Sequence, residues 1–372
     1  MKFSCIQENL FKGLQVVSHI AGTSSGLPIL ANILLKTEDG FLTLCSTNLE
    51  MGVKCTVRGK VETEGVIAID ARIITEYLGL LPKDRVELEV LEGPILSISC
   101  GTYHTQIKGV VADEYPILPP AEKAHSLQCR AKDLKKHLQR VVGAAKYDET
   151  RMELSGVLFV AHEKTLTLVA TDAYRLAEST LVLDEAAAQD IRVIVPLKTV
   201  QELLRNLSDD PEMVVQLMIS DTQITAVVEN IELVSKLVDG QYPDYTQIIP
   251  SSFSTRAVVD RQEWMRAVKA SSIFSKSGLN DVTLDFAPGE SDKGILTISS
   301  ANTTVGETAV KLDIQCSGSA MSASLNYRYL LDGLQNMTTT QVSVGAIDSN
   351  SPCILKPVNE EGYQYMVMPI RE

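Results

Sequence analysis

The sequence predicts an α+β protein built from three similar domains, each with two helices and antiparallel sheets. One strand-like stretch occurs three times, at offsets of 124 and 130 residues, over residues 42–44, 166–168 and 296–298. The apolar stripe of a helix repeats at the same two offsets, beginning at Leu10, Leu134 and Trp264. The chain of 372 residues is too long for one typical domain, whereas a third of it is an ordinary domain size.

The first third sets out the order of the elements. Residues 1–7 are expected to form a strand, and a helix follows from about Glu8. Alternating apolar residues then predict four strands, at 32–36, 40–45, 53–57 and 66–69. Asp70 is expected to cap the second helix, because its carboxylate can accept hydrogen bonds from the first backbone N–H groups. Three more strands are predicted, at 85–91, 95–100 and 104–110, with a hairpin turn at Glu92 and Gly93.

The other two thirds repeat this order. Pro196 and Asn326 stand where Asp70 stands, so we expect a first-turn proline and a cap at the corresponding helices. The predicted domains are 1–122 (N-terminal), 123–250 (central) and 251–372 (C-terminal), with short proline-stiffened linkers between them. Antiparallel domains with open sheet edges can pair edge to edge, and a closed ring would leave no edge unpaired.

The composition excludes several classes of protein. No stretch approaches membrane-spanning length and the N-terminus lacks an apolar signal region, so a cytoplasmic protein is expected. Seven cysteines are scattered and never spaced as Cys-x-x-Cys, which is typical of reduced core residues rather than of a disulfide frame or metal site. The five histidines do not occur at metal-ligand spacing. We therefore expect neither a metal nor a cofactor.

The charge is unevenly distributed along the chain. The net charge of −13 alone argues against a nucleic-acid partner. Six predicted helical windows nevertheless contain 15 Lys and Arg against 8 Asp and Glu: 7–22, 70–81, 130–146, 196–207, 260–276 and 325–337. Basic residues can simply make well-solvated helices. Alternatively, the helices share one surface that faces a polyanion.

Two segments could form a functional site. Residues 171–177 bring Asp172, Tyr174 and Arg175 close together, either as a turn with an Asp–Arg ion pair or as the site of a hydrolase. No Walker loop, Gly-x-Gly-x-x-Gly or His-Glu-x-x-His motif occurs, and no catalytic residues are expected. In the C-terminal run, Pro369 cannot donate to a strand ladder, so the last residues should leave the sheet and present an adaptable apolar surface.

Motifs in all three thirds carry a family resemblance. They are Leu27-Pro28-Ile29-Leu30, the stretch from Leu154 to Phe159, the stretch from Ala170 to Ala177, Tyr242-Pro243-Asp244-Tyr245 and Met368-Pro369-Ile370-Arg371. With the threefold repeat, they closely resemble the bacterial DNA polymerase III beta subunit family, the DNA sliding clamps. The resemblance covers the whole chain in order.

The resemblance implies a fold and a function. A head-to-tail homodimer would form a ring of six domains, with helices lining the hole and sheets forming the rim. The ring would encircle duplex DNA without sequence-specific contacts. It would confer processivity on the replicative polymerase without being an enzyme itself. Polymerase, clamp loader and repair proteins would insert a Gln-Leu-x-Leu-Phe-like peptide into a hydrophobic groove between the second and third domains.

The resemblance also implies three sets of residues. The groove would be lined by Leu154, Thr171, Tyr174, Arg175, Leu176, Pro243, Leu279, Asn326, Tyr329, Met366, Val367, Met368, Pro369 and Arg371. The cations expected to face DNA from the helices are Lys12, Arg72, Lys132, Lys136, Arg140, Lys198 and Arg205. At the dimer interface, Ile273 and Phe274 would meet Ile107 of the second copy. Alternatively, these three are core residues of their own domains.

The chain also departs from the family pattern. Clamps usually have Gly-His where this chain has Ala173 and Tyr174, and they commonly end in Met-Arg-Leu rather than Ile-Arg-Glu. The loop at 23–26 lacks an arginine, and Asp148 stands where a neutral side chain is common. These differences leave open the peptide preference and the strength of DNA contact. A protein-binding scaffold without a DNA role remains an alternative, as does a hydrolase at Asp172, Tyr174 and Arg175.

Overall fold

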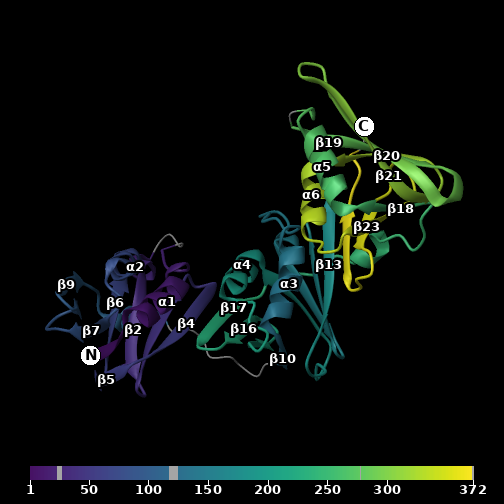
Figure 1. Cartoon of the computed structure of the whole chain (residues 1–372). Coiled ribbons are helices and arrows are strands. Elements are labelled where there is room, and N and C mark those ends of the chain that lie inside the picture. Colours follow the sequence, from purple (N-terminus) through teal and green to yellow (C-terminus); the bar gives the residue numbers. More distant parts are fainter. Residues whose placement is uncertain (23–26, 117–124, 277, 371–372) are drawn as a thin grey trace. The chain divides into compact units, whose positions relative to one another are not determined.

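The computed structural model describes residues 1–22, 27–116, 125–276 and 278–370 (Figure 1). Its described residues show one order of elements three times: a strand, a helix, a group of strands, a second helix and three more strands. The predicted α+β class and its triplication are therefore confirmed. No helix in the described ranges is long and apolar enough to cross a membrane.

The N-terminal repeat contains two helices and nine strands within its described part. They are β1 (Lys2–Ile6), α1 (Gln7–Ser18), β2 (Asn32–Glu38), β3 (Phe41–Thr47), β4 (Met51–Arg58), β5 (Lys60–Thr63), β6 (Gly65–Asp70), α2 (Ala71–Leu80), β7 (Arg85–Val90), β8 (Ile95–Cys100) and β9 (Tyr103–Lys108). The sequence missed β5, whose four residues are too few to show a clear alternation.

The central and C-terminal repeats follow the same order. The central elements are β10 (His125–Arg130), α3 (Ala131–Val142), β11 (Gly156–His162), β12 (Thr165–Thr171), β13 (Arg175–Val182), β14 (Ile191–Pro196), α4 (Leu197–Asn206), β15 (Val214–Ile219), β16 (Gln223–Val228) and β17 (Ile231–Lys236). The C-terminal elements are β18 (Thr255–Asp260), α5 (Arg261–Ser272), β19 (Asp281–Pro288), β20 (Lys293–Asn302), β21 (Gly306–Gly318), β22 (Met321–Asn326), α6 (Tyr327–Gln335), β23 (Gln341–Ala346), β24 (Cys353–Pro357) and β25 (Tyr363–Val367).

The second helix of each repeat begins close to where the sequence predicts it. The Asp70 carboxylate accepts a hydrogen bond from Ile73 N at 2.9 Å, and the Asn326 side chain accepts one from Arg328 N at 2.9 Å. Both predicted caps are confirmed. Pro196 is the last residue of β14, where it pairs with Gly156, and α4 begins one residue later. Its expected place in the first turn is therefore wrong by one residue, because the strand extends up to the helix.

The first of two compact units contains Met1–Lys132 and Arg205–Leu237. One of its sheets has five strands in the order β5-β1-β7-β8-β9, and the other has eight in the order β10-β15-β16-β17-β4-β3-β2-β6. Helix α1 packs against α2 and β4 through Leu10, Leu14 and Val17, which are buried. Strand β17 of the central repeat pairs with β4 of the N-terminal repeat, so their sheets are continuous.

The second unit contains Asp133–Leu204 and Val238–Glu372, of which the last two residues are not described. It holds a sheet of twelve strands, in the order β14-β11-β12-β13-β25-β24-β23-β18-β21-β20-β19-β22. Here β13 of the central repeat pairs with β25 of the C-terminal repeat. Helices α5 and α6 lie side by side (Figure 1), and Trp264 of α5 is fully buried. The predicted edge-to-edge pairing of domains thus occurs inside each unit.

The hairpin between the third and fourth strands uses the same turn in two repeats. Asn48 Oδ1 accepts hydrogen bonds from Glu50 N and Met51 N, at 3.0 and 2.8 Å. Asp172 Oδ1 does the same for the two residues at the equivalent positions, at 3.0 Å each. The residue after the acceptor has a positive φ in both turns, 75° for Leu49 and 73° for Ala173. The turn is thus part of the repeat, and its central copy lies at the candidate site.

Candidate functional site

A pocket of about 480 Å³ lies within the second unit. It forms where the turn between β12 and β13 meets the N-terminus of α6 and the segment that follows β25. Its lining residues are Ala173, Tyr174, Gly278, Leu279, Asn326, Tyr329, Met368, Pro369 and Ile370. Six of these nine residues belong to the groove that the sequence predicts.

The C-terminal segment leaves the sheet as predicted. Strand β25 ends at Val367, and Pro369 follows two residues later. Met368 N donates a hydrogen bond to Tyr174 O at 2.8 Å, and Ile370 N donates one to Ser324 O at 2.8 Å. These two bonds hold the segment between the β12–β13 turn and β22. Met368 and Ile370 are partly exposed there, so the pocket has an apolar and conformationally adaptable wall.

The turn beside the pocket is closed by its own polar groups. Thr171 Oγ1 donates to Arg175 O at 2.6 Å and accepts from Ala173 N at 3.1 Å. Ala173 is held at positive φ, so the next side chain projects away from the hairpin. Tyr174 is accordingly 61% exposed and lines the pocket. Its ring offers a large apolar surface with a hydroxyl group at its tip.

Arg175 links this turn to helix α6. Its Nε lies 3.1 Å from Asp172 Oδ2, its Nη1 donates to Asp332, and its guanidinium stacks 4.4 Å from the centre of the Tyr329 ring. Burial opposes the charge, but Tyr365, Asp332 and Asp172 outweigh burial, and the pKa of Arg175 is raised. The predicted Asp–Arg pair is thus present. Both carboxylate oxygens of Asp172 accept hydrogen bonds, Oδ1 from the turn backbone and Oδ2 from Arg175 Nε. This arrangement supports a structural role rather than proton transfer.

The remaining predicted groove residues occupy different positions. Leu154, Leu176 and Met366 are buried in an apolar cluster with Tyr242 and Tyr245, and Met368 packs against that cluster. Thr171 and Val367 are also buried, and Pro243 is exposed next to the cluster. Arg371 lies outside the described residues. The structure therefore brings most of the set together as an open pocket beside a buried apolar floor.

Sequence reasoning missed some residues at this site. Ala173, Gly278 and Ile370 line the pocket. All three adjoin predicted residues, so their position in the chain was the available signal. Asp332 accepts a hydrogen bond from Arg175 and is 157 residues away from it in sequence. Nothing local in the sequence marks such a partner.

The cations predicted to face DNA are exposed with one exception. Lys12, Arg72, Lys132, Lys136, Lys198 and Arg205 are exposed on their helices. Arg140 is only 3% exposed, and its Nη2 donates to Glu360 Oε1 at 2.7 Å. The reason is helical geometry: each step of four residues turns about 40° further round the helix, so Arg140 lies about 80° from Lys132. Arg140 is therefore a correction to the predicted surface.

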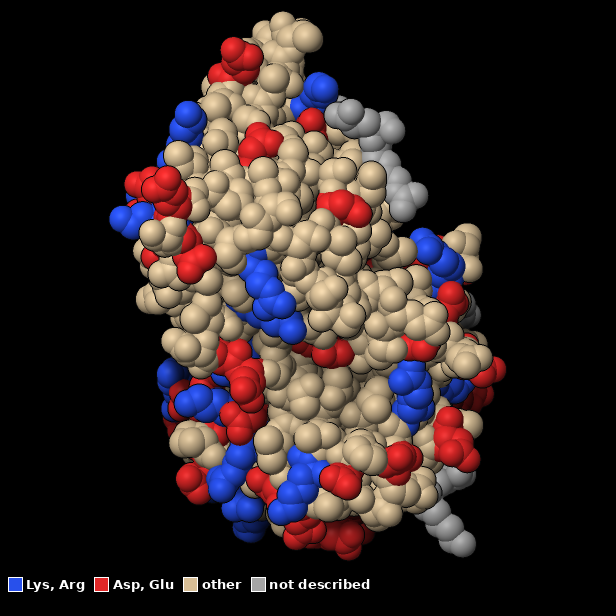
Figure 2. Space-filling view, turned by 90° about the vertical axis from the view of Figure 1, so that its right-hand side faces the viewer, with Lys and Arg blue, Asp and Glu red and all other residues tan. Residues whose placement is uncertain are grey.

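The charge separation between helices and the remainder persists in the structure. The six helices of the described residues contain 12 Lys and Arg against 6 Asp and Glu. On the face drawn in Figure 2, basic and acidic residues are interspersed among uncharged surface, so positive charge does not gather into a stripe there. The helices therefore remain the basic part of an acidic chain.

The three predicted interface residues differ in exposure. Ile273, at the end of α5, is 69% exposed, and Phe274 beside it is half-buried. Ile107 is 8% exposed and packs within its own repeat, which is the alternative that the sequence allowed. Leu80 at the end of α2 is 81% exposed, and Val305 before β21 is also exposed. The sequence did not mark Leu80 and Val305 as exposed apolar residues, because the ends of helices and turns carry no apolar periodicity.

Comparison with known proteins decides the family. Models of the N-terminal, central and C-terminal domains of the DNA polymerase III beta subunit match residues 1–119, 128–244 and 246–371. The chain belongs to the DNA polymerase III beta subunit family. The beta sliding clamp of Synechococcus elongatus is 30% identical over 379 residues, covering 100% of this chain and 99% of the relative.

Solved structures agree with this assignment. The DNA polymerase sliding clamp of Bacillus subtilis matches with a TM-score of 0.95 and 28% identity, covering 100% of this chain and 99% of that one. The DNA polymerase III beta subunit of Pseudomonas aeruginosa, solved bound to griselimycin, matches with a TM-score of 0.94 and 28% identity over the full length of both chains. The three repeats are thus beta-clamp domains. The function is that of a beta sliding clamp, a non-catalytic processivity subunit in DNA replication, and not that of a hydrolase.

Proposed function

We propose that two copies of this chain form a head-to-tail ring of six domains around duplex DNA. The ring would tether the replicative polymerase, the clamp loader and repair proteins through the pocket beside Tyr174. The proposed domains are 1–122, 123–250 and 251–372, acting in the cytoplasm. No cofactor or metal takes part in this proposal. Binding is topological, so the tether provides a high effective concentration of polymerase on DNA.

The pairing of sheet edges carries the dimer proposal. Within the chain, β4 pairs with β17 and β13 pairs with β25. In the repeated order, β21 corresponds to β4 and β13, and β9 corresponds to β17 and β25. Among the described strands, β9 ends its sheet, and the first part of β21 pairs only with β20. The same joint can therefore form a third time, between β21 of one copy and β9 of another.

The internal joints predict the register of this pairing. Ile231 lies opposite Cys55 in one joint, and Tyr363 lies opposite Ser179 in the other. Ile231 and Tyr363 are the first residues of their strands, as Tyr103 is of β9, and the repeat offset of 130 takes Ser179 to Ala309. The second copy's Tyr103 would therefore lie opposite Ala309. Four residues along, its Ile107 lies opposite Val305. Ile107 thus takes part through its backbone and can remain buried in its own domain.

Exposed apolar residues flank the proposed joint on both sides. The α2 helix presents Ile73 and Leu80, seven residues apart and hence on one face. The opposite side presents Ile273 and Val305. Covering such residues is favourable at about 25 cal/mol per Å² of apolar surface. A pocket of about 440 Å³ also lies between α5 and β21, lined by residues that include Arg266, Ala270 and Val310.

The β13–β25 joint has a turn at the equivalent place, which suggests an occupant for that pocket. There the turn after β24 reaches α3, where Glu360 binds Lys136 and Arg140. Lys136 and Arg140 correspond to Arg266 and Ala270 by the repeat offset. The second copy's shorter turn between β8 and β9, Gly101 and Thr102, would lie over the pocket without an ion pair to Arg266.

Sedimentation velocity tests the dimer. We expect Ile273→Asp and Leu80→Asp to yield monomers, since each places an unpaired charge in the joint. Val182→Asp is the matched control, because Val182 is equally exposed on β13 but lies outside the proposed joint. Dimers of both interface variants at the same concentration as the control would overturn the proposed arrangement.

Peptide binding tests the groove. A labelled peptide containing Gln-Leu-x-Leu-Phe should show saturable fluorescence anisotropy with the full chain. Removing residues 368–372 should abolish the signal, because Met368, Pro369 and Ile370 form one wall of the pocket. Tyr147→Ala is the control, since this exposed tyrosine lies outside the pocket. Unchanged binding after the truncation would contradict the proposal.

Retention on DNA tests encirclement and distinguishes a clamp from a protein-binding scaffold. Loaded protein should stay on closed circular DNA and leave once the circle is cut. Lys132→Glu with Lys198→Glu should weaken loading and reduce its dependence on salt, because both side chains are exposed cations on helices. For a scaffold without a DNA role, neither cutting the circle nor the double substitution would change the amount of protein retained on DNA.

A further inference from the structure

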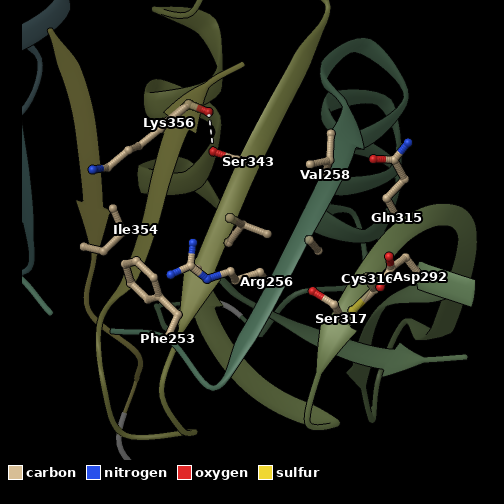
Figure 3. A pocket seen from close by; sticks show the side chains of 13 residues that line it. Phe253, Arg256, Val258, Asp292, Gln315, Cys316, Ser317, Ser343, Ile354 and Lys356 are labelled. Atoms are coloured by element: carbon tan, nitrogen blue, oxygen red, sulfur yellow. Dashed lines mark hydrogen bonds between the residues drawn. The ribbon is translucent and has the colours of Figure 1, made fainter. Parts of the chain in front are cut away.

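A trough of about 430 Å³ lies in the C-terminal repeat, on the sheet formed by β24, β23, β18 and β21. Figure 3 shows Lys356, Ile354, Phe253 and Arg256 toward one side, with Gln315 and Ser317 across β18 from them. The Arg256 guanidinium stacks 5.3 Å from the centre of the Phe253 ring. Apart from Ile354, which belongs to the buried apolar cluster beside the Tyr174 pocket, these residues take no part in that pocket or in the proposed dimer joint.

The trough and the buried floor of the groove share one face of one sheet. A single row of directly opposed residues crosses six strands: Leu176, Met366, Ile354, Gly345, Arg256 and Ser317. Directly opposed residues in antiparallel strands point to the same face. Leu176, Met366 and Ile354 belong to the apolar cluster of the groove. The row therefore runs from that cluster to Arg256.

Phe253 occupies the middle of this row. A Cβ atom on Gly345 would lie 2.7 Å from the Phe253 ring, so the ring lies directly on the glycine backbone. Phe253 also packs against the apolar cluster. It therefore continues the apolar surface of the groove up to the guanidinium that it stacks against. Lys356, two residues after Ile354 on β24, is exposed on the same face.

The trough suits an anionic segment. Arg256 and Lys356 provide two cations, and the Ser317 and Gln315 side chains provide donors, whereas the Ser343 hydroxyl donates to Lys356 O at 3.1 Å. Asp292 is the one carboxylate among the lining residues, which leaves a net positive site. The helices carry a net charge of +6 in a chain of net charge −13, so the residues outside the helices are strongly acidic on average and a net positive site among them is an exception.

We infer that the trough binds an acidic segment of the same partner whose apolar motif occupies the groove. This inference rests on the proposed groove. The distance from β25 to β18 is three strand spacings, about 14 Å, which an extended chain covers in four or five residues. The acidic residues of the partner should therefore stand about that far from the apolar motif.

Peptide affinity tests the inference. Three peptides are compared by anisotropy: the motif with a five-residue Gly-Ser spacer and three aspartates after it, the same with the aspartates before it, and a version with asparagines. One acidic peptide should bind about 5- to 10-fold more tightly than the neutral one, because two partly exposed ion pairs form. The difference should shrink as salt is raised.

Variants separate this site from the groove. Arg256→Gln with Lys356→Gln should remove the advantage of the acidic peptide and leave the affinity of the neutral peptide unchanged. Lys164→Gln with Lys269→Gln removes two exposed cations elsewhere and should preserve the advantage. Equal affinity for all three peptides, or an advantage that survives the first double variant, overturns the inference. If the neutral motif itself fails to bind, the groove is wrong and the inference falls with it.

Discussion

Glu360 is expected to stabilise the joint between the central and C-terminal domains. It lies in the turn after β24, and its Oε1 accepts hydrogen bonds from Lys136 Nζ and Arg140 Nη2 on α3, each at 2.7 Å. Arg140 is buried and stacks 4.9 Å from the centre of the Tyr363 ring. Replacing Glu360 with glutamine removes the charge that pairs with a buried guanidinium.

The magnitude follows from the carboxyl group. Burial would raise the pKa of Glu360, but the hydrogen bonds from Lys136 and Arg140 outweigh burial and lower it from 4.5 to about 2. At 1.36 kcal/mol per pKa unit, the ionised form contributes about 3 kcal/mol to stability. Because the folded pKa is the lower one, this contribution is fully present above pH 4.5 and is lost as the pH falls toward 2. Lys136 is 45% exposed, so water screens its ion pair with Glu360, and that pair contributes less than about 1 kcal/mol to stability.

Urea unfolding followed by tryptophan fluorescence measures this effect. The chain has a single tryptophan, Trp264, buried in α5 of the C-terminal domain. At pH 7 we expect Glu360→Gln to lower the free energy of unfolding by about 2–3 kcal/mol and Lys136→Met by less than about 1 kcal/mol. The loss for Glu360→Gln should shrink as the pH is lowered from 4.5 toward 2.

Glu361→Gln is the matched control, because this neighbouring glutamate is exposed. It should leave the urea midpoint nearly unchanged. A midpoint for Glu360→Gln equal to that of the control, or a loss that does not depend on pH, would refute the reasoning.

Three further predictions follow from local chemistry. Ala173→Gly should raise the thermal midpoint by relieving a positive φ of 73°, a gain of about 1 kcal/mol, and Leu49→Gly at 75° should act alike; a fall in both midpoints would contradict this. Burial, followed by the charges of Arg140 and Lys136, lowers the pKa of His137 from 6.5 to about 4. Stability should therefore fall as the pH drops from 6.5 toward 4. In a profile of the urea midpoint against pH, His137→Gln should flatten this range. Burial raises the pKa of the Cys5, Cys45 and Cys353 thiols to about 12, so Ellman's reagent at pH 8 should label these thiols slowly in the folded chain and all seven cysteines rapidly in urea; fast labelling of all seven without urea would disprove it.

The local pattern of the sequence determined most of the elements. Asp70 and Asn326 cap their helices because a short polar side chain can reach backbone N–H groups two or three residues ahead. The end of β25 follows from Pro369, which has no N–H to donate. The triplication was visible because repeated domains keep their spacing. Each of these signals depends on neighbours along the chain.

Part of the site could also be read from the sequence. Tyr174, Met368 and Pro369 line the pocket as the family resemblance implied. The Asp172–Arg175 pair was visible because its members are three residues apart. The role of Asp332 was not visible, because helix α6 brings it to Arg175 from a distant part of the chain.

The tertiary structure alone decided which residues that are far apart in the sequence come into contact. Arg140 looked like an exposed cation, yet Glu360, 220 residues later, meets it under the β24–β25 turn and makes it a buried ion pair. The row from Leu176 to Arg256 exists only because β13 pairs with β25, a register between strands from different domains. The sequence by itself determined three copies of one domain, the caps of two helices and the Asp172–Arg175 pair. Which strand edges joined and which charges were buried depended on long-range packing, where burial and pairing energies exceed local preferences.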